Sequence, residues 1–144
     1  MSGVAEITKI LRSDECAQID FTFRCISISG ADLRNIANLV EAGTIRLVRS
    51  AYLPSAWMVY SFEYDAIIMG QAPEANNVVH ECVHAVNDFR VTRIPVVDDE
   101  AVAYIAQSIY LKLAQPKYRS ERIVKILAEK NPNLVTTCTT SQDS

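Results

Sequence analysis

The 144-residue sequence lacks any run of about 18 or more apolar residues, the minimum for a helix that crosses a membrane. It also lacks an excess of basic residues, because 17 acidic residues outnumber 14 lysines and arginines and leave a net charge of -3. Proteins that bind nucleic acid present a basic field to the phosphate backbone. We therefore expect neither a membrane nor a nucleic acid as a partner.

The N-terminus lacks the features of a secretory signal. Residues 1–11 carry Glu6 and Lys9, and they contain neither a continuous apolar run nor a small-residue cleavage site. The cytoplasm is therefore the default location, and export by a route without an N-terminal signal stays open. The four cysteines show no CxxC spacing and are expected to be free thiols: Cys16, Cys25, Cys82 and Cys138.

Internal repeats and linkers are also absent between residues 4 and 130, which argues against a second domain. The apolar share of 49% and the charged share of 22% are those of an ordinary globular protein. Residues 131–144 are rich in Thr, Ser and Asn and have little apolar surface to bury. We expect one domain over residues 1–130 and a disordered tail over residues 131–144.

The first part of the chain mixes helical and strand patterns. Residues 4–12 fit a short helix, and apolar residues alternate with polar ones from residue 19 to residue 23, which predicts a half-buried strand. The apolar positions then shift to Ile26 and Ile28, which indicates a bulge or the end of the strand.

A capped helix and three short strands are predicted next. Ser29 fits the N-cap of a helix that ends at a left-handed Gly43. Three short strand-like runs follow, and turn residues separate them, so we expect a small antiparallel element: 44–48, 57–62 and 66–69.

The rest of the chain is expected to be helical. One helix begins near Pro73 and ends near Phe89, and Asp98 or Asp99 is expected to cap the next, which runs to Pro116. A last helix is predicted over residues 120–130. The fold class is therefore α+β, with a small mixed sheet before a central helix and two further helices after it.

The central helix carries the motif His80-Glu81-Cys82-Val83-His84, which reads HExxH. Residues four apart lie on one face of a helix, so the two imidazoles can share one metal ion. Glu81 lies about 100° round from His80, where its carboxylate can reach a water on that ion. Cys82 lies about 200° away and is expected in the core. The chain has only two histidines, and both are in this motif.

The motif resembles that of the HExxH zinc metallopeptidases, and its uncharged neighbours Val83, Ala85 and Val86 add to the resemblance. It implies one zinc ion per chain, held by His80 and His84, with Glu81 as the general base of peptide hydrolysis. In these enzymes an edge strand before the motif helix pairs with the substrate. Residues 66–69 are the candidate for that strand, and an ordinary core hairpin is the equal alternative.

A catalytic zinc takes a third protein ligand. The metzincin class would place glycine and histidine where this chain has Asn87 and Arg90, and is therefore excluded. The gluzincin class takes a glutamate from the next helix, and Glu100 matches that position. Asp98 and Asp99 compete for the same role, although both also fit as helix caps.

The zinc ligands need a further side chain that bonds and orients them. Tyr104 stands where gluzincins often carry an aspartate, so Asp88, one turn past His84, becomes the candidate for that support. The oxyanion of the reaction needs a further donor, and four residues offer one without a preference among them: Tyr60, Arg90, Arg93 and Tyr104.

The resemblance thus implies a small zinc metallopeptidase acting on a peptide or protein substrate. A chain of this size has little room for the second lobe of larger gluzincins, so a partner chain could complete the cleft. Two alternatives stay open: a zinc-binding regulatory or interaction protein without turnover, and a metal-free interaction module in which the motif is accidental.

Overall fold

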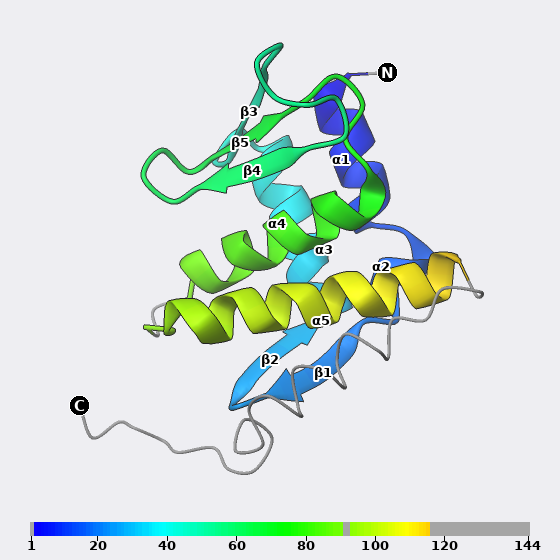
Figure 1. Cartoon of the computed structure of the whole chain (residues 1–144), viewed down its shortest axis with the longest axis vertical. Helices are drawn as coiled ribbons and strands as arrows, with labels where there is room; N and C mark the ends of the chain where they lie inside the picture. The colour runs from blue at the N-terminus through cyan, green and yellow to red at the C-terminus, as the bar shows by residue number, and fades with distance from the viewer. Residues whose placement is uncertain (1, 91–92, 116–144) are drawn as a thin grey trace.

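Two antiparallel helices, α4 and α5, cross the middle of the computed structural model (Figure 1). The structure describes residues 2–90 and 93–115. Within these ranges the helices are α1 (Gly3–Leu11), α2 (Asp14–Ala17), α3 (Gly30–Glu41), α4 (Ala75–Asp88) and α5 (Val96–Ala114). The strands are β1 (Asp20–Phe23), β2 (Ile26–Ser29), β3 (Arg46–Arg49), β4 (Met58–Ser61) and β5 (Ala66–Met69). The predicted α+β fold class is confirmed.

The larger sheet has the strand order β3-β5-β4. β4 pairs with β5 in antiparallel fashion, with Tyr60 opposite Ile67, whereas β3 and β5 are parallel. The sheet is therefore mixed, as the predicted fold class states, and the expectation that its three strands are all antiparallel was wrong. Of the two alternatives for residues 66–69, the edge strand was wrong, because β5 is the central strand. The reason is that the chain leaves β3, crosses over and returns as β4 on the far side of β5. β4 is consequently the edge strand that faces α4.

β1 and β2 form an antiparallel hairpin below α5 (Figure 1). Of the two alternatives predicted here, a bulge or the end of the strand, the second is confirmed: β1 ends at Phe23, and a tight turn follows at Arg24 and Cys25, whose φ angles of 48° and 69° are both left-handed. Such a turn normally carries Gly, Asn or Asp, so Arg24 and Cys25 did not predict it. Cys25 is disulfide-bonded, which overturns the expectation of a free thiol there, whereas Cys16 and Cys82 are free. Cys138 lies outside the described residues.

The predicted ends of α3 are confirmed. Ser29 forms a capping box with Asp32, in which each side chain bonds the backbone N–H of the other residue. Gly43 follows the helix with a φ of 81°, a conformation that costs a glycine nothing. α1 also spans almost the range expected for the first helix.

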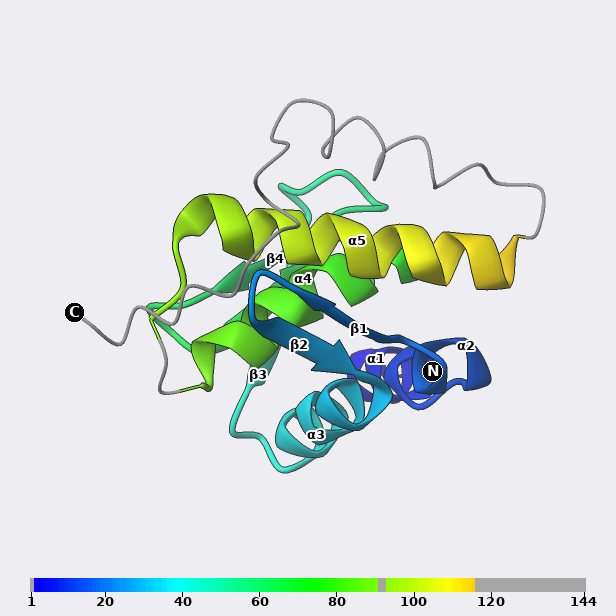
Figure 2. The same cartoon turned by 90° about the horizontal axis from the view of Figure 1, so that it is seen from below.

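α4 is the central element of the core. Its apolar face, including Val79 and Val83, is fully buried, and α1 and α3 cover one side of it (Figure 2). β4 and α5 contact the other sides, so the face that carries the histidines meets α5. The sequence motif is therefore held on a helix that is packed on every side.

α5 begins earlier than predicted. Its N-cap is Pro95, and no side chain caps it, so the expectation that Asp98 or Asp99 caps this helix was wrong. Both aspartates lie inside the first turn and are free to bond elsewhere. The helix and the tail predicted over 120–130 and 131–144 fall outside the described residues. In the described part of the chain, no helix combines the length and the apolar character that spanning a bilayer requires.

Candidate metal centre

The three predicted ligands converge where α4 meets α5. Glu100 Oε1 lies 2.7 Å from His80 Nε2 and 3.7 Å from His84 Nε2. One donor atom from each of these residues lies within 4.8 Å of the others. Both histidines are buried, whereas the Glu100 side chain is 48% exposed. Glu100 is thus the most exposed of the three proposed ligands.

Asp99 supports His84. Its Oδ2 lies 3.0 Å from His84 Nδ1, at ion-pair distance but without the alignment of a hydrogen bond. The other carboxylate oxygen accepts from Asn87 Nδ2 at 2.7 Å, which fixes the side chain. Burial lowers the pKa of His84, but the carboxylates of Asp99, Glu81 and Glu100 outweigh burial and leave that pKa raised. Asp99 therefore favours a proton on Nδ1 and leaves Nε2 toward Glu100.

Asp88 was expected to support the histidines, and this expectation was wrong. The Tyr60 hydroxyl donates to Asp88 Oδ2 at 2.6 Å, so this carboxylate faces β4 and not the histidines. Asp88 lies at the last position of α4, and α5 supplies the partner of His84 instead. Asp98 also turns away from the centre, because it pairs with Arg24 of the hairpin at 3.1 Å.

Gln107 supports the other histidine and was missed in the sequence. Its Oε1 lies 2.8 Å from His80 Nδ1. Gln107 follows Glu100 by seven residues on α5, so the two lie on the same face two turns apart. That spacing was the one feature of the sequence that could have indicated the contact with His80, but a glutamine on a helix is common without such a role.

Glu81 lies beside the ligands, as the helix geometry predicts. Its Oε2 is 3.7 Å from His80 Nε2, and its Oε1 accepts the backbone N–H of Tyr60 at 2.9 Å. The side chain is only 18% exposed. Cys82 points into the core, where burial raises the pKa of its thiol. Its expected place in the core is confirmed.

Two exposed aromatic rings flank the histidines. Tyr104 packs edge-on against His80 with ring centroids 4.6 Å apart, and Phe62 lies 6.4 Å from His84. Of the four candidate oxyanion donors, Tyr60 is buried against Asp88, and Arg90 pairs with Asp32 at 3.1 Å. Tyr104 and Arg93 are the exposed two.

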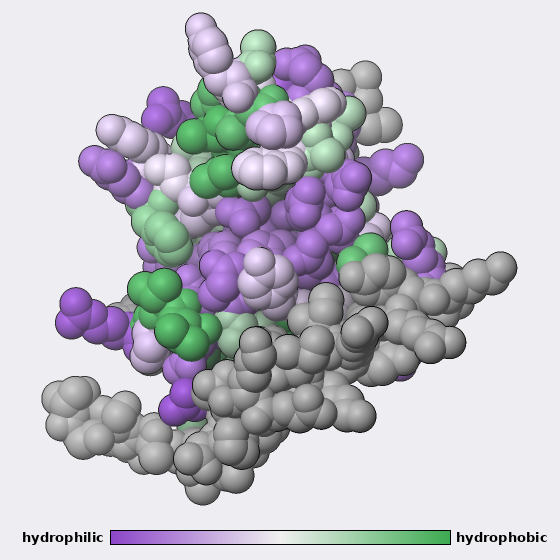
Figure 3. Space-filling view, viewed as in Figure 1, coloured by the Kyte–Doolittle hydropathy of each residue, from purple (hydrophilic) through white to green (hydrophobic). Residues whose placement is uncertain are grey.

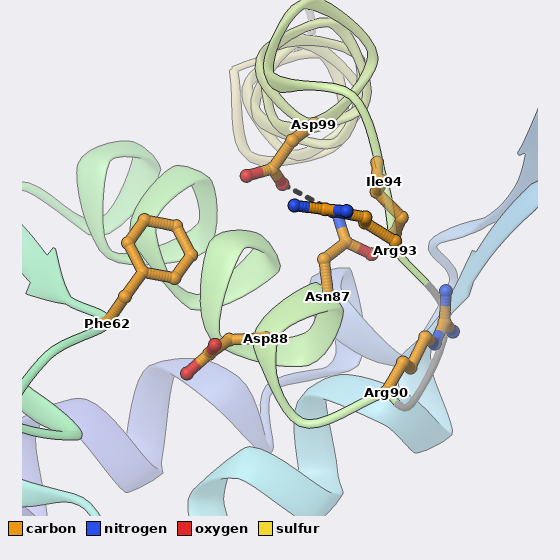
Figure 4. Close-up of a pocket in the computed structure, with 7 residues that line it drawn as sticks. All are labelled: Phe62, Asn87, Asp88, Arg90, Arg93, Ile94 and Asp99. Carbon is orange, nitrogen blue, oxygen red and sulfur yellow. Dashed lines mark hydrogen bonds between the residues drawn. The ribbon is translucent and has the colours of Figure 1, made fainter.

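A pocket of about 320 Å³ opens beside His84, at the junction of α4, α5 and the turn after β4 (Figure 4). Phe62 and Asp99 line it, and both also contact His84. Its other lining residues are Asn87, Asp88, Arg90, Arg93 and Ile94. Hydrophilic residues dominate the middle of the surface above α4 and α5, whereas apolar residues gather over the three-stranded sheet and over the first turn of α5 (Figure 3).

The donor set fits a zinc ion. Each histidine has an acceptor near Nδ1, so both Nε2 atoms are left to act as ligands, and both face the same oxygen of Glu100. Two imidazoles and one carboxylate are a common protein ligand set of catalytic zinc, which keeps its fourth position for water or substrate. The exposed side of Glu100 leaves room for that position.

Comparisons with known proteins add no family to this geometry. No protein-family model, no curated protein and no solved structure matches the chain.

Proposed function

We propose that the protein is a zinc-dependent peptidase of the gluzincin type. The observation that carries the proposal is the convergence of His80, His84 and Glu100 with Glu81 beside them. A purely structural zinc usually fills its four positions with Cys and His. Here a carboxylate is the third donor and a second carboxylate stands next to the site, which favours chemistry.

The proposed ligands and the proposed base have separate roles. His80, His84 and Glu100 would hold the ion, and a zinc ion bound there supplies a Lewis acid for the scissile carbonyl. Glu81 accepts the proton of the attacking water on its free oxygen and gives it to the leaving amine. The Tyr60 N–H holds the other oxygen, so the carboxylate is already oriented for this transfer.

The substrate is an extended peptide or a protein segment. β4 is the edge of its sheet and runs beside α4, and edge strands accept extended peptides by strand addition. The pairing would use backbone groups other than the Tyr60 N–H, which Glu81 occupies. Val59 and Phe62 are 41% and 54% exposed on or just after this strand and offer apolar contacts. The far wall of the cleft comes from the substrate protein itself or from a partner chain.

One observation favours a second candidate, a zinc-binding regulatory protein without turnover. The Glu81 side chain is only 18% exposed, and the Tyr60 N–H occupies one of its two oxygens, so the approach of a water to the remaining oxygen is restricted. Activity separates the two candidates, because both bind zinc.

The test combines metal content with one variant. The purified protein should carry about one zinc ion per chain and should cleave an unstructured protein such as casein. Glu81→Gln should keep the zinc and lose cleavage, because the amide is nearly isosteric but cannot accept the proton. Less than a tenth of an equivalent of zinc after loading and desalting would end the proposal. Full activity of Glu81→Gln would end the assignment of the base.

A further inference from the structure

Three side-chain amides form a row that ends on His80. Asn76 and Asn77 lie in the first turn of α4, and Gln107 reaches them from α5. Gln107 Nε2 donates to Asn76 Oδ1 at 2.7 Å and lies 3.5 Å from Asn77 Oδ1. Its Oε1 lies 2.8 Å from His80 Nδ1. Nothing in the proposed reaction uses this row.

The ends of the row fix its direction. An amide side chain offers a donor on one atom and an acceptor on the other, so a row of amides can run either way unless its ends decide. Asn76 Nδ2 contacts Glu74 Oε2 at 3.1 Å, and a carboxylate can only accept. Asn77 Nδ2 contacts the backbone carbonyl of Ala56 at 2.9 Å, and a carbonyl can only accept. Both asparagines therefore turn their oxygens toward Gln107.

The direction of hydrogen bonding along the row determines which nitrogen of His80 donates to Gln107. Since Gln107 meets two oxygens with its Nε2, its own oxygen faces His80, and Nδ1 must carry the proton of that contact. We infer that Gln107 is a positioning residue, which makes Nδ1 the protonated nitrogen of the neutral His80 ring and leaves the lone pair of Nε2 for a metal ion shared with Glu100. This inference deepens the proposed metal site and rests on it.

The two histidines then differ in their support. His84 has a carboxylate at Nδ1, whereas His80 has a neutral amide. A charged acceptor makes an imidazole a stronger donor to a metal than a neutral one does. Gln107→Glu should therefore retain the acceptor and the affinity for zinc, whereas Gln107→Met keeps the shape of the side chain and loses the strong acceptor.

The first arm of the test needs no metal. In the Glu100→Ala protein, treated with a chelator, the carboxylate 2.7 Å from His80 Nε2 is removed, and the Glu81 carboxylate, at 3.7 Å, lies beyond hydrogen-bond distance. Nitrogen-15 NMR about two pH units above the ordinary histidine pKa reports which nitrogen carries the proton. The chain has only two histidines, and His84→Gln assigns them. We expect the proton on Nδ1 of His80, and a shift toward Nε2 when Gln107→Met is added. A proton on Nε2 with Gln107 intact, or no shift in the double variant, overturns the inference.

The second arm measures zinc affinity by competition with a chelator in the full chain. Gln107→Met should bind zinc about 10- to 100-fold more weakly than the parent, and Gln107→Glu should restore the affinity. Gln115→Met, the same change at the end of α5, is the control and should equal the parent. Parent-like affinity of Gln107→Met overturns the inference. A parent that binds no zinc ends the proposed function instead, and the first arm still decides the role of Gln107.

Discussion

Three consecutive acidic side chains in the first turns of α5 have three different partners. Asp98 pairs with Arg24, Asp99 with His84, and Glu100 with His80. Neighbouring residues on a helix point about 100° apart, so only one of the three can face both imidazoles squarely. This rotation, rather than acidity as such, makes Glu100 the candidate third ligand.

Substitutions in this turn should separate a ligand from its neighbours. Glu100→Ala should weaken zinc binding by about tenfold or more, because two histidines alone lack a third donor and its charge. Asp98→Ala, whose carboxylate faces the hairpin, should bind zinc as the parent does. Chelator competition measures both. The assignment of the ligand fails if Asp98→Ala loses zinc and Glu100→Ala keeps it.

Cys16 and Cys82, the free cysteines of the described part of the chain, should be unreactive in the folded protein. Both are fully buried, and burial raises the pKa of Cys16 to about 11 and also raises that of Cys82. At pH 8 only about one Cys16 thiol in a thousand would be the reactive thiolate. Iodoacetamide, followed by mass spectrometry of the peptides, should label both cysteines in urea and neither in buffer. Rapid labelling of Cys82 in buffer would show that α4 is not packed as described.

The motif and its helix geometry predicted where His80, Glu81 and His84 lie, because that geometry is local. The partners of the two Nδ1 atoms were not predictable in the same way. Asp99 and Gln107 reach the histidines only because of the angle at which α5 packs on α4. That angle cannot be predicted from the residues of either helix alone. Asp88 had the right spacing on α4, but its carboxylate accepts a hydrogen bond from Tyr60 of β4 instead of supporting a histidine.

At the scale of elements, Tyr60 attaches β4 to α4 at two points. Its N–H donates to Glu81, and its hydroxyl donates to Asp88, two turns further along the helix. Burial, followed by the Asp88 contact, raises the pKa of this tyrosine far above its ordinary value. The edge strand and the proposed base are therefore held in one fixed relation.

Removal of the hydroxyl should loosen this attachment. Tyr60→Phe leaves the partly buried Asp88 carboxylate without its donor, which should cost about 1–3 kcal/mol of unfolding free energy in urea. The N–H contact with Glu81 is unaffected, so zinc content should stay the same. Tyr64→Phe, at a 62% exposed tyrosine just after β4, is the matched control and should be neutral. Equal stability of both variants would mean that the hydroxyl contact contributes nothing.

At the scale of the whole molecule, helix positions were easier to predict than strand order. The ends of α3 are encoded by Ser29 and Gly43, which act on their own backbone. The order β3-β5-β4 depends on how the chain crosses between β3 and β4. Short apolar runs predict that strands form but not the order in which they pair. The sequence therefore could not decide whether residues 66–69 form an edge strand or part of a core hairpin; they form the central strand, and β4 is the edge strand next to α4.

The antiparallel pairing of α4 and α5 also has a consequence for how much of the protein is folded at a given concentration of free zinc. An ion held by two histidines of one helix and a glutamate of the other binds only when the helices are paired, so mass action should favour the folded chain. At a free zinc concentration 100 times the dissociation constant the gain would be about 2.7 kcal/mol. Calorimetry should show a melting temperature that rises with the logarithm of zinc concentration. His80→Ala should abolish that rise, and Glu81→Gln should retain it.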